Sequence, residues 1–251
     1  MGHMTRAGVT WVDLAAEIQR RSDAGRAVEF WWRDDDASVP NGEVERLLEL
    51  SRSHRMPLAL AVIPQQADAG LFALLHEHVA VLQHGTDHRN RAAAGEKKTE
   101  YPAAEPVDAA LARISQGLNR LAGVSAFMPV LAPPWNRMRK DLLDKLPGIG
   151  IRGISAYGPQ ARREPAPGLR QVNTHVDIVA WRRGKCFAGE DEMLALALSH
   201  LRSTDGPIGW LTHHAVHDAA AWDFLERLFT VRGVRWLSAA EAFSYTAPAH
   251  G

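Results

Sequence analysis

The sequence has 251 residues and carries 29 basic and 29 acidic side chains, so its formal net charge is zero when histidine is neutral. A neutral chain has no broad attraction for nucleic acid or for an anionic membrane surface, and we expect small or uncharged partners. Because Cys186 is the only cysteine, an intramolecular disulfide and a cysteine-rich zinc module are excluded. The length suits a single α/β barrel, which needs roughly 200–250 residues.

The N-terminus indicates no export signal and the chain no membrane anchor. No stretch approaches the roughly 18–20 apolar residues that span a bilayer, and no basic head followed by an apolar run begins the chain. We therefore expect a cytoplasmic protein. Residues 1–4, Met-Gly-His-Met, are interpreted as a cloning remnant, and residues 5–251 are expected to form a single barrel domain.

Apolar or β-rich runs alternate with amphipathic segments along the chain. In chain order, we expect a helix over 11–26, a strand over 27–32, a helix over 44–54, a strand over 57–63, a helix over 71–77, a strand over 79–83, a helix over 107–122, a strand over 127–131, a helix over 140–146, strands over 149–154 and 174–180, a helix over 191–202, a strand over 207–212, a helix over 219–232 and a strand over 234–237. The polar stretch 92–106 predicts a solvated loop or flap. This alternation implies parallel strands with crossover helices, whose active site forms at the C-terminal strand ends.

Three aspartates, Asp34 to Asp36, directly follow the first apolar strand. Adjacent carboxylates repel one another and each prefers water, so this placement favours a cation that neutralises them. An acidic loop that caps the next helix is the alternative interpretation.

His84 and His88 follow the third strand. Histidines at i and i+4 share one face of a helical turn and can bind one metal ion, although a chance surface pair is an alternative for this spacing alone. An aspartate and two histidines supply three ligands and leave a position open, as in catalytic zinc sites. We expect one divalent metal ion, zinc in the first place, although cobalt or manganese also suits these ligands.

Further candidates follow the later strands. Pro134 and Trp135 predict a rigid, partly apolar wall for a substrate groove, or else an ordinary proline loop. Asp177, followed by Trp181, and His213 lie at two other strand ends. The carboxylate could fix the tautomer of the imidazole, which would then work as a general acid. A structural histidine is the alternative.

Taken together, the ordered motifs resemble the metal-dependent polysaccharide deacetylases, carbohydrate esterase family 4. The motifs are an Asp-Asp pair, His-x-x-x-His, a Pro-Pro-aromatic loop, Asp-x-x-x-Trp and Leu-x-His, and they extend from Phe30 to His213. The resemblance implies a distorted (β/α)7 barrel that removes N- or O-acetyl groups from a small-molecule or oligosaccharide substrate.

The resemblance also implies a role for each motif. The first aspartate of the pair is the catalytic base and the second binds the metal. We favour Asp35 and Asp36, because Ala37 to Pro40 then matches the small residue and proline that follow the pair; Asp34 with Asp35 is the alternative register. The remaining roles are metal binding by His84 and His88, general acid by His213, orientation of that acid by Asp177, and substrate binding by Pro134, Trp135 and Trp181.

One departure from the family pattern concerns an arginine. Ala132 stands where the family has an arginine that pairs with the catalytic aspartate, and Arg33 or Arg137 could replace it. Two other functions therefore stay open. One is a hydrolase of another small-molecule amide or C–N bond, and the other is a non-catalytic carbohydrate-binding barrel, which the missing arginine favours.

Overall fold

The computed structural model describes residues 8–204 and 206–244, so the interpretation of residues 1–4 lies outside the described residues. Its main sheet is parallel, with the strand order β6-β5-β4-β3-β2-β1-β10-β7, and β11 pairs with the first half of β1. The strands are β1 (Val28–Ala37), β2 (Leu58–Val62), β3 (Val79–His84), β4 (Phe127–Ala132), β5 (Gly153–Ile154), β6 (Arg170–Gln171), β7 (Val176–Asp177), β10 (Ile208–Thr212) and β11 (Val234–Leu237).

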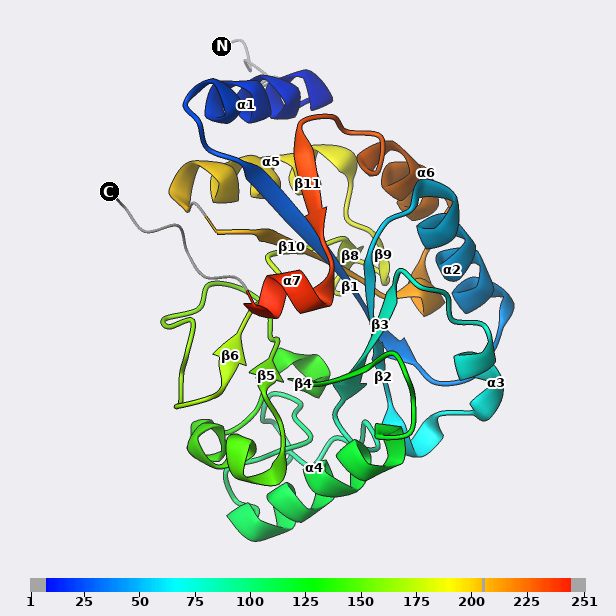
Figure 1. Ribbon diagram of the computed structural model, residues 1–251, viewed down its shortest axis with the longest axis vertical. Coiled ribbons are helices and arrows are strands. Elements are labelled where there is room, and N and C mark those ends of the chain that lie inside the picture. The colour runs from blue at the N-terminus through cyan, green and yellow to red at the C-terminus, as the bar shows by residue number, and fades with distance from the viewer. Residues whose placement is uncertain (1–7, 205, 245–251) are drawn as a thin grey trace.

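Helices surround the outside of this curled sheet (Figure 1). The α-helices are α1 (Trp11–Asp23), α2 (Gly42–His54), α3 (Ala69–Ala73), α4 (Val107–Leu121), α5 (Glu190–Ser203), α6 (Ala219–Leu228) and α7 (Ala239–Ser244), and the 3-10 helices are η1 (Pro64–Gln66), η2 (Pro134–Asn136), η3 (Lys140–Ile149) and η4 (His214–Val216). In the described chain β6 and β7 are the two edges of the sheet, so the barrel is open. The expectation of a distorted (β/α)7 barrel is confirmed.

Side-chain alternation along β1 separates two hydrophobic cores. Trp31 packs inside the barrel against small residues such as Ala59 and Ala61. Trp32 faces outward and packs in the larger core that the helices cover, with residues such as Leu47 and Leu225. Because successive side chains of a strand point to opposite faces, the charged residues that follow these tryptophans also divide between the two sides.

Several elements differ from the sequence predictions. The strand predicted over 27–32 extends to Ala37 and contains the aspartates, which therefore do not lie in a loop. The strand predicted over 174–180 is divided into β7 and β8 (Val179–Ala180), and β8 forms an antiparallel hairpin with β9 (Cys186–Phe187). Residues 140–149 form a 3-10 helix, and neither β6 nor α7 was predicted.

The ends of the helices follow local chemistry. Thr10 and Asp13 form a capping box at the start of α1, and the side chain of Asn41 accepts the N–H of Val44 at the start of α2. Among the described residues, no helix is long and apolar enough to cross a membrane. The cytoplasmic location stays a prediction.

Candidate active site

Asp36, His84 and His88 come together at the C-terminal ends of β1 and β3. One side-chain ligand atom of each lies within 4.8 Å of the others. The Oδ1 atom of Asp36 is 3.1 Å from Nε2 of His84 and 3.2 Å from Nε2 of His88. Three side chains that could bind a metal ion therefore come together after two strands.

A bulge in β1 turns Asp36 toward this point. Arg33 and Asp34 pair with consecutive residues of β2, but the next pair begins at Ala37, so β1 holds one residue more than its neighbour. Asp36 takes the left-handed φ of 74° at this position. A bulge can re-aim one side chain, and here it places two successive residues, Asp35 and Asp36, on the site side.

The histidine segment is a loop and not the helical turn that the spacing predicted. Gly85 and His88 both adopt left-handed φ values, 61° and 56°. A Cβ on Gly85 would lie 2.2 Å from Glu100 Oε2, so only glycine fits there. The carboxylate of Glu100 accepts the N–H groups of Thr86 at 3.0 Å and of His88 at 3.1 Å. Glu100 thus holds the loop that carries His88.

Glu100 was not among the sequence candidates, because the polar stretch 92–106 indicated a solvated flap. In the structure Glu100 and Tyr101 are buried within that stretch. Burial raises the pKa of Glu100, and the charge of Asp87 acts in the same direction. Its position, 12 residues beyond His88, carries no local signal that could have revealed it.

His84 has a fixed tautomer. Its Nδ1 atom is 3.0 Å from the carbonyl oxygen of Ala132, which can only accept, so Nδ1 carries the proton. Nε2 then faces Asp36. A metal-bound histidine commonly donates its second ring N–H to a carbonyl in this way.

Arg33 pairs with Asp35, although it lies in β1 and not at the place of Ala132. Its Nη2 atom donates a hydrogen bond to Oδ2 of Asp35 at 2.9 Å, and its Nε atom lies 2.9 Å from Oδ1 in the same ion pair. Further bonds run to Ser155 and, at 2.7 Å, to Asn136 Oδ1. Arg137 instead donates to the carbonyl of Lys98. Of the two arginines considered, Arg33 is the one that pairs with Asp35.

Asp34 points to the other side of the sheet. It is fully buried and its Oδ1 atom is 2.5 Å from Nδ1 of His214. Burial alone would raise the pKa of Asp34, but the charge and the hydrogen bond of His214 outweigh that cost and lower it. Asp34 is therefore engaged away from the cluster, whereas Asp35 and Asp36 adjoin it.

His213 lies opposite the cluster, with Nε2 at 3.9 Å from Asp35 Oδ2. The expected hydrogen bond to Asp177 does not form: the carboxylate of Asp177 accepts the indole N–H of Trp181 at 2.8 Å and the backbone N–H of Val179 at 3.0 Å. Within the described residues, Nδ1 of His213 has no hydrogen-bond partner. The exposed ring of Trp181 packs edge-on against His213 with centroids 4.6 Å apart.

Trp135 forms the opposite wall. Its ring lies 4.5 Å from the ring of His88, and the buried Pro134 precedes it. Trp135 and Asn136 both have left-handed φ values, 54° and 56°. Together with Asp36 and His88, they are four of the six non-glycine residues with positive φ in the described chain. Backbone strain of this kind concentrates at functional sites.

The donor set fits a divalent cation. Oδ1 of Asp36 is buried and has no hydrogen-bond partner of adequate geometry among the described atoms, although two imidazole nitrogens face it. Burial would raise the pKa of Asp36, but its interactions with His84 and His88 outweigh this effect and lower it. A carboxylate and two imidazoles facing one point are the ligands that zinc, cobalt and manganese accept.

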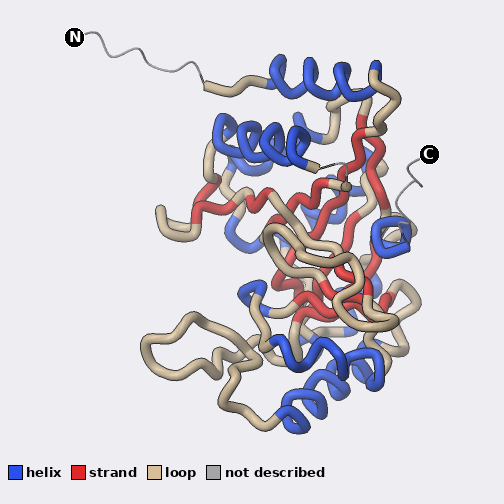
Figure 2. The backbone as a smooth tube through the Cα atoms, turned by 90° about the vertical axis from the view of Figure 1, so that its left-hand side faces the viewer, coloured by secondary structure: helices blue, strands red, loops and turns tan. Residues whose placement is uncertain are grey.

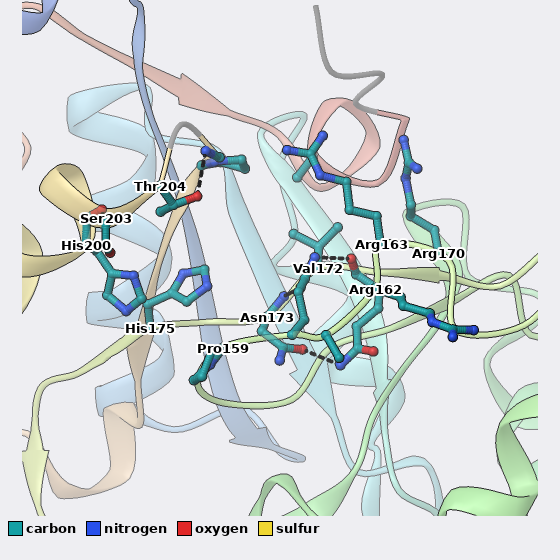
Figure 3. Close-up of a pocket in the computed structure, with 16 residues that line it drawn as sticks. Pro159, Arg162, Arg163, Arg170, Val172, Asn173, His175, His200, Ser203 and Thr204 are labelled. Carbon is teal, nitrogen blue, oxygen red and sulfur yellow. Dashed lines mark hydrogen bonds between the residues drawn. The ribbon is translucent and has the colours of Figure 1, made fainter.

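A separate cavity of about 450 Å³ lies beside β6 and the start of β7. The rings of His175 and His200 lie on one side of it, tilted by 53° with centroids 4.3 Å apart, and Arg163 and Arg170 lie on the other side (Figure 3). The predicted site residues do not line this cavity.

Comparisons by sequence and by structure differ. No protein-family model matches the sequence, and no curated protein matches it. Solved structures do match. A family 4 carbohydrate esterase from Streptomyces lividans, in complex with acetate, has a TM-score of 0.52 at 17% identity over 83% of this chain and 90% of that one.

Two further structures are similar. A peptidoglycan N-acetylglucosamine deacetylase has a TM-score of 0.55 at 15% identity over 88% of this chain and 90% of its own. A family 4 acetyl xylan esterase from Clostridium thermocellum, in complex with cobalt, has a TM-score of 0.50 at 12% identity over 87% and 91%. The chain thus has the fold of the family 4 carbohydrate esterases, and its Asp/His/His cluster lies at the C-terminal ends of the strands.

Proposed function

We propose that this protein is a metal-dependent deacetylase that hydrolyses an acetyl group from an N-acetylated sugar or a polysaccharide-derived substrate. The observation that carries the proposal is the convergence of Asp36, His84 and His88 beside the Arg33–Asp35 pair and His213. The fold shared with carbohydrate esterases and deacetylases supports the same reaction class.

Asp36, His84 and His88 would hold one divalent ion, with zinc as the first candidate. A cobalt ion is bound in the similar acetyl xylan esterase. When bound, such an ion polarises a carbonyl group and lowers the pKa of water. The carbonyl of Ala132 keeps the Nε2 atom of His84 directed at the ion.

Asp35 and His213 would move the protons. Asp35 lies next to the metal ligands and accepts the proton of the attacking water. The hydrogen bond from Nη2 of Arg33, with Nε of the same guanidinium facing the second oxygen, holds the carboxylate of Asp35 in place. His213 faces Asp35 and protonates the departing amine nitrogen, which completes the cleavage of the amide bond.

Trp135 and Trp181 would hold the sugar between them. Their rings pack on His88 and on His213, on opposite sides of the site. Large aromatic faces suit the apolar faces of a sugar ring, and they bury area at a low entropic cost. A paired Arg33 also weakens the case for a barrel that only binds carbohydrate, since that case depended on a missing arginine.

Acetate release tests the proposal. The protein is stripped with a chelator, reloaded with zinc, cobalt or manganese, and assayed on N-acetylated monosaccharides, chitin oligosaccharides, peptidoglycan fragments and acetylated xylan. We expect metal-dependent acetate release from at least one N-acetylated sugar. Asp35→Asn should retain the metal but lose about 10²–10⁴-fold in kcat.

Two outcomes would contradict this proposal. Release of acetate that does not depend on metal would remove the cluster from the mechanism. Turnover of acyclic amides, with no acetate from any of the sugars, would instead favour the other small-molecule C–N hydrolase.

A further inference from the structure

The buried carboxylate of Asp34 binds the chain on both sides of His213. It accepts the hydroxyl of Thr212 at 2.6 Å and the backbone N–H of His214 at 3.0 Å, both on Oδ2. Its Oδ1 atom faces Nδ1 of His214 at 2.5 Å. One side chain of β1 therefore fixes the residues immediately before and after the histidine that faces Asp35.

Two more contacts complete this arrangement. The indole N–H of Trp32 donates to the hydroxyl of Thr212 at 2.8 Å. The backbone N–H of His213 donates to Nε2 of His217 at 3.3 Å. Burial lowers the pKa of His217 to about 4, so its ring is neutral at pH 7 and can accept this bond. Asp34 and His217 thus both hold the backbone around His213.

The side chain of His213, by contrast, is not held by a carboxylate. Asp177 accepts from Trp181 and Val179, and Nδ1 of His213 has no hydrogen-bond partner in the described part of the chain. Its Nε2 atom nevertheless lies 3.9 Å from Asp35. The position of the ring must then follow from its backbone and from the packing of Trp181.

We propose that Asp34, acting through Thr212 and His214, is a positioning residue that holds the His213 imidazole beside Asp35. The proposal rests on the proposed function, in which His213 donates a proton. It accounts for three consecutive aspartates: Asp36 binds metal, Asp35 accepts a proton, and Asp34 orients the acid from the far side of the sheet. A displacement of about 1 Å in a reacting group costs about 100-fold in rate, so a firm backbone matters there.

Three variants of the full-length, metal-loaded protein test this role. Asp34→Ala and His214→Ala should lower kcat about 10- to 100-fold, with KM within about twofold and metal content unchanged. His214→Asn keeps a donor near the place of Nδ1 and should restore kcat to within about threefold of the unsubstituted protein. Should Asp34→Ala fail to fold, Asp34→Asn gives the same direction with a smaller loss.

A matched control and a second readout separate positioning from general stability. Ser51→Ala removes the hydrogen bond from the buried Ser51 of α2 to the carbonyl oxygen of Met56 at 2.6 Å, and it should lower the melting temperature without lowering kcat. Crystal structures of the unsubstituted and Asp34→Ala proteins at one pH should show the His213 ring displaced or in several rotamers in the variant.

The two readouts also keep this inference apart from the proposed function. A His213 ring that keeps one position in Asp34→Ala, or an unchanged kcat in the folded variant, would overturn the positioning role. An unsubstituted protein that releases no acetate would overturn the proposed function alone, because the crystallographic comparison needs no turnover.

Discussion

The two faces of β1 carry the same kinds of residue and use them differently. On the inner face Trp31 is followed by Arg33 and Asp35, and on the outer face Trp32 is followed by Asp34. The inner carboxylate is paired with an arginine and adjoins the cluster of Asp36, His84 and His88. The outer one is paired with His214 and is fully buried. Because successive side chains of a strand point to opposite faces, the neighbouring carboxylates form separate ion pairs with different partners.

The largest effect is expected in the cluster of Asp36, His84 and His88, beside the inner face of β1. His84→Ala removes a ligand that is almost wholly buried, and we expect loss of bound metal with a fall in turnover of about 10³-fold or more. Elemental analysis measures the bound metal, and acetate release measures the turnover. His54→Ala is the matched control, since His54 pairs with Glu226 at the surface. A variant that keeps both its metal and its turnover would remove His84 from the site.

The next largest effect is expected when the Arg33–Asp35 ion pair is broken. Arg33→Met leaves a buried carboxylate without its partner and should lower the free energy of unfolding by about 3–5 kcal/mol. Urea unfolding measures the loss. Arg52→Met, in an exposed pair with Glu49, should change it by less than about 1 kcal/mol. Equal losses in the two variants would mean that the Arg33–Asp35 pair stabilises no more than a surface pair does.

On the outer face of β1, the partly buried His217 predicts that stability depends on pH. Burial lowers the pKa of His217 to about 4, while the unfolded value is about 6.5. Between these values the unfolded chain binds more protons, so stability falls as pH falls from about 6.5 toward 4, by about 3 kcal/mol in total. His217→Gln should show a shallower decline in urea unfolding over this range. An identical slope in both proteins would contradict the assignment.

His214 on the same face has the opposite sign. Burial lowers its pKa, but the charge of Asp34 outweighs that effect and raises it. The stability that this pair contributes is complete below the unfolded value of about 6.5 and is lost as pH rises through the folded pKa. His214 and His217, three residues apart, therefore have opposite effects on how stability changes with pH.

The smallest effect is expected at Trp181. Trp181→Phe keeps an aromatic ring against His213 but loses the indole N–H that binds Asp177. One hydrogen bond contributes about 1 kcal/mol, so kcat/KM should fall about fivefold. Steady-state kinetics on the acetylated substrate measure it. A loss as large as that of His84→Ala would mean that the indole N–H itself touches the substrate.

Much of the fold and part of the site could be predicted from the sequence. Strand and helix alternation predicted the parallel sheet, and strand-end motifs predicted that Asp36, His84 and His88 meet. The direction of the Asp36 side chain could not be predicted, because it depends on one extra residue in β1 relative to β2. Arg33 at i−2 from Asp35 was a readable signal in a strand, since both side chains share a face.

Other features depended on tertiary contacts that carry no local pattern. Glu100 is buried because three backbone N–H groups of the histidine loop need an acceptor, and those groups lie more than ten residues away. Proline is rare inside strands, and Pro129 is accommodated in β4 where β3 and β4 change register. The sequence predicted a contact between Asp177 and His213. Asp177 instead accepts the indole N–H of Trp181, which follows it closely in the same segment of the chain.

The left-handed backbone at Asp36 narrows which residues evolution can place there. This conformation costs most L-residues about 1–2 kcal/mol, and aspartate and asparagine are the oxygen-bearing side chains that tolerate it. Glutamate would keep the charge but would carry the conformational cost and a longer reach. Asparagine would keep the backbone but lose the charge. At this one position the shape of the chain and the chemistry of the ligand both select the same amino acid.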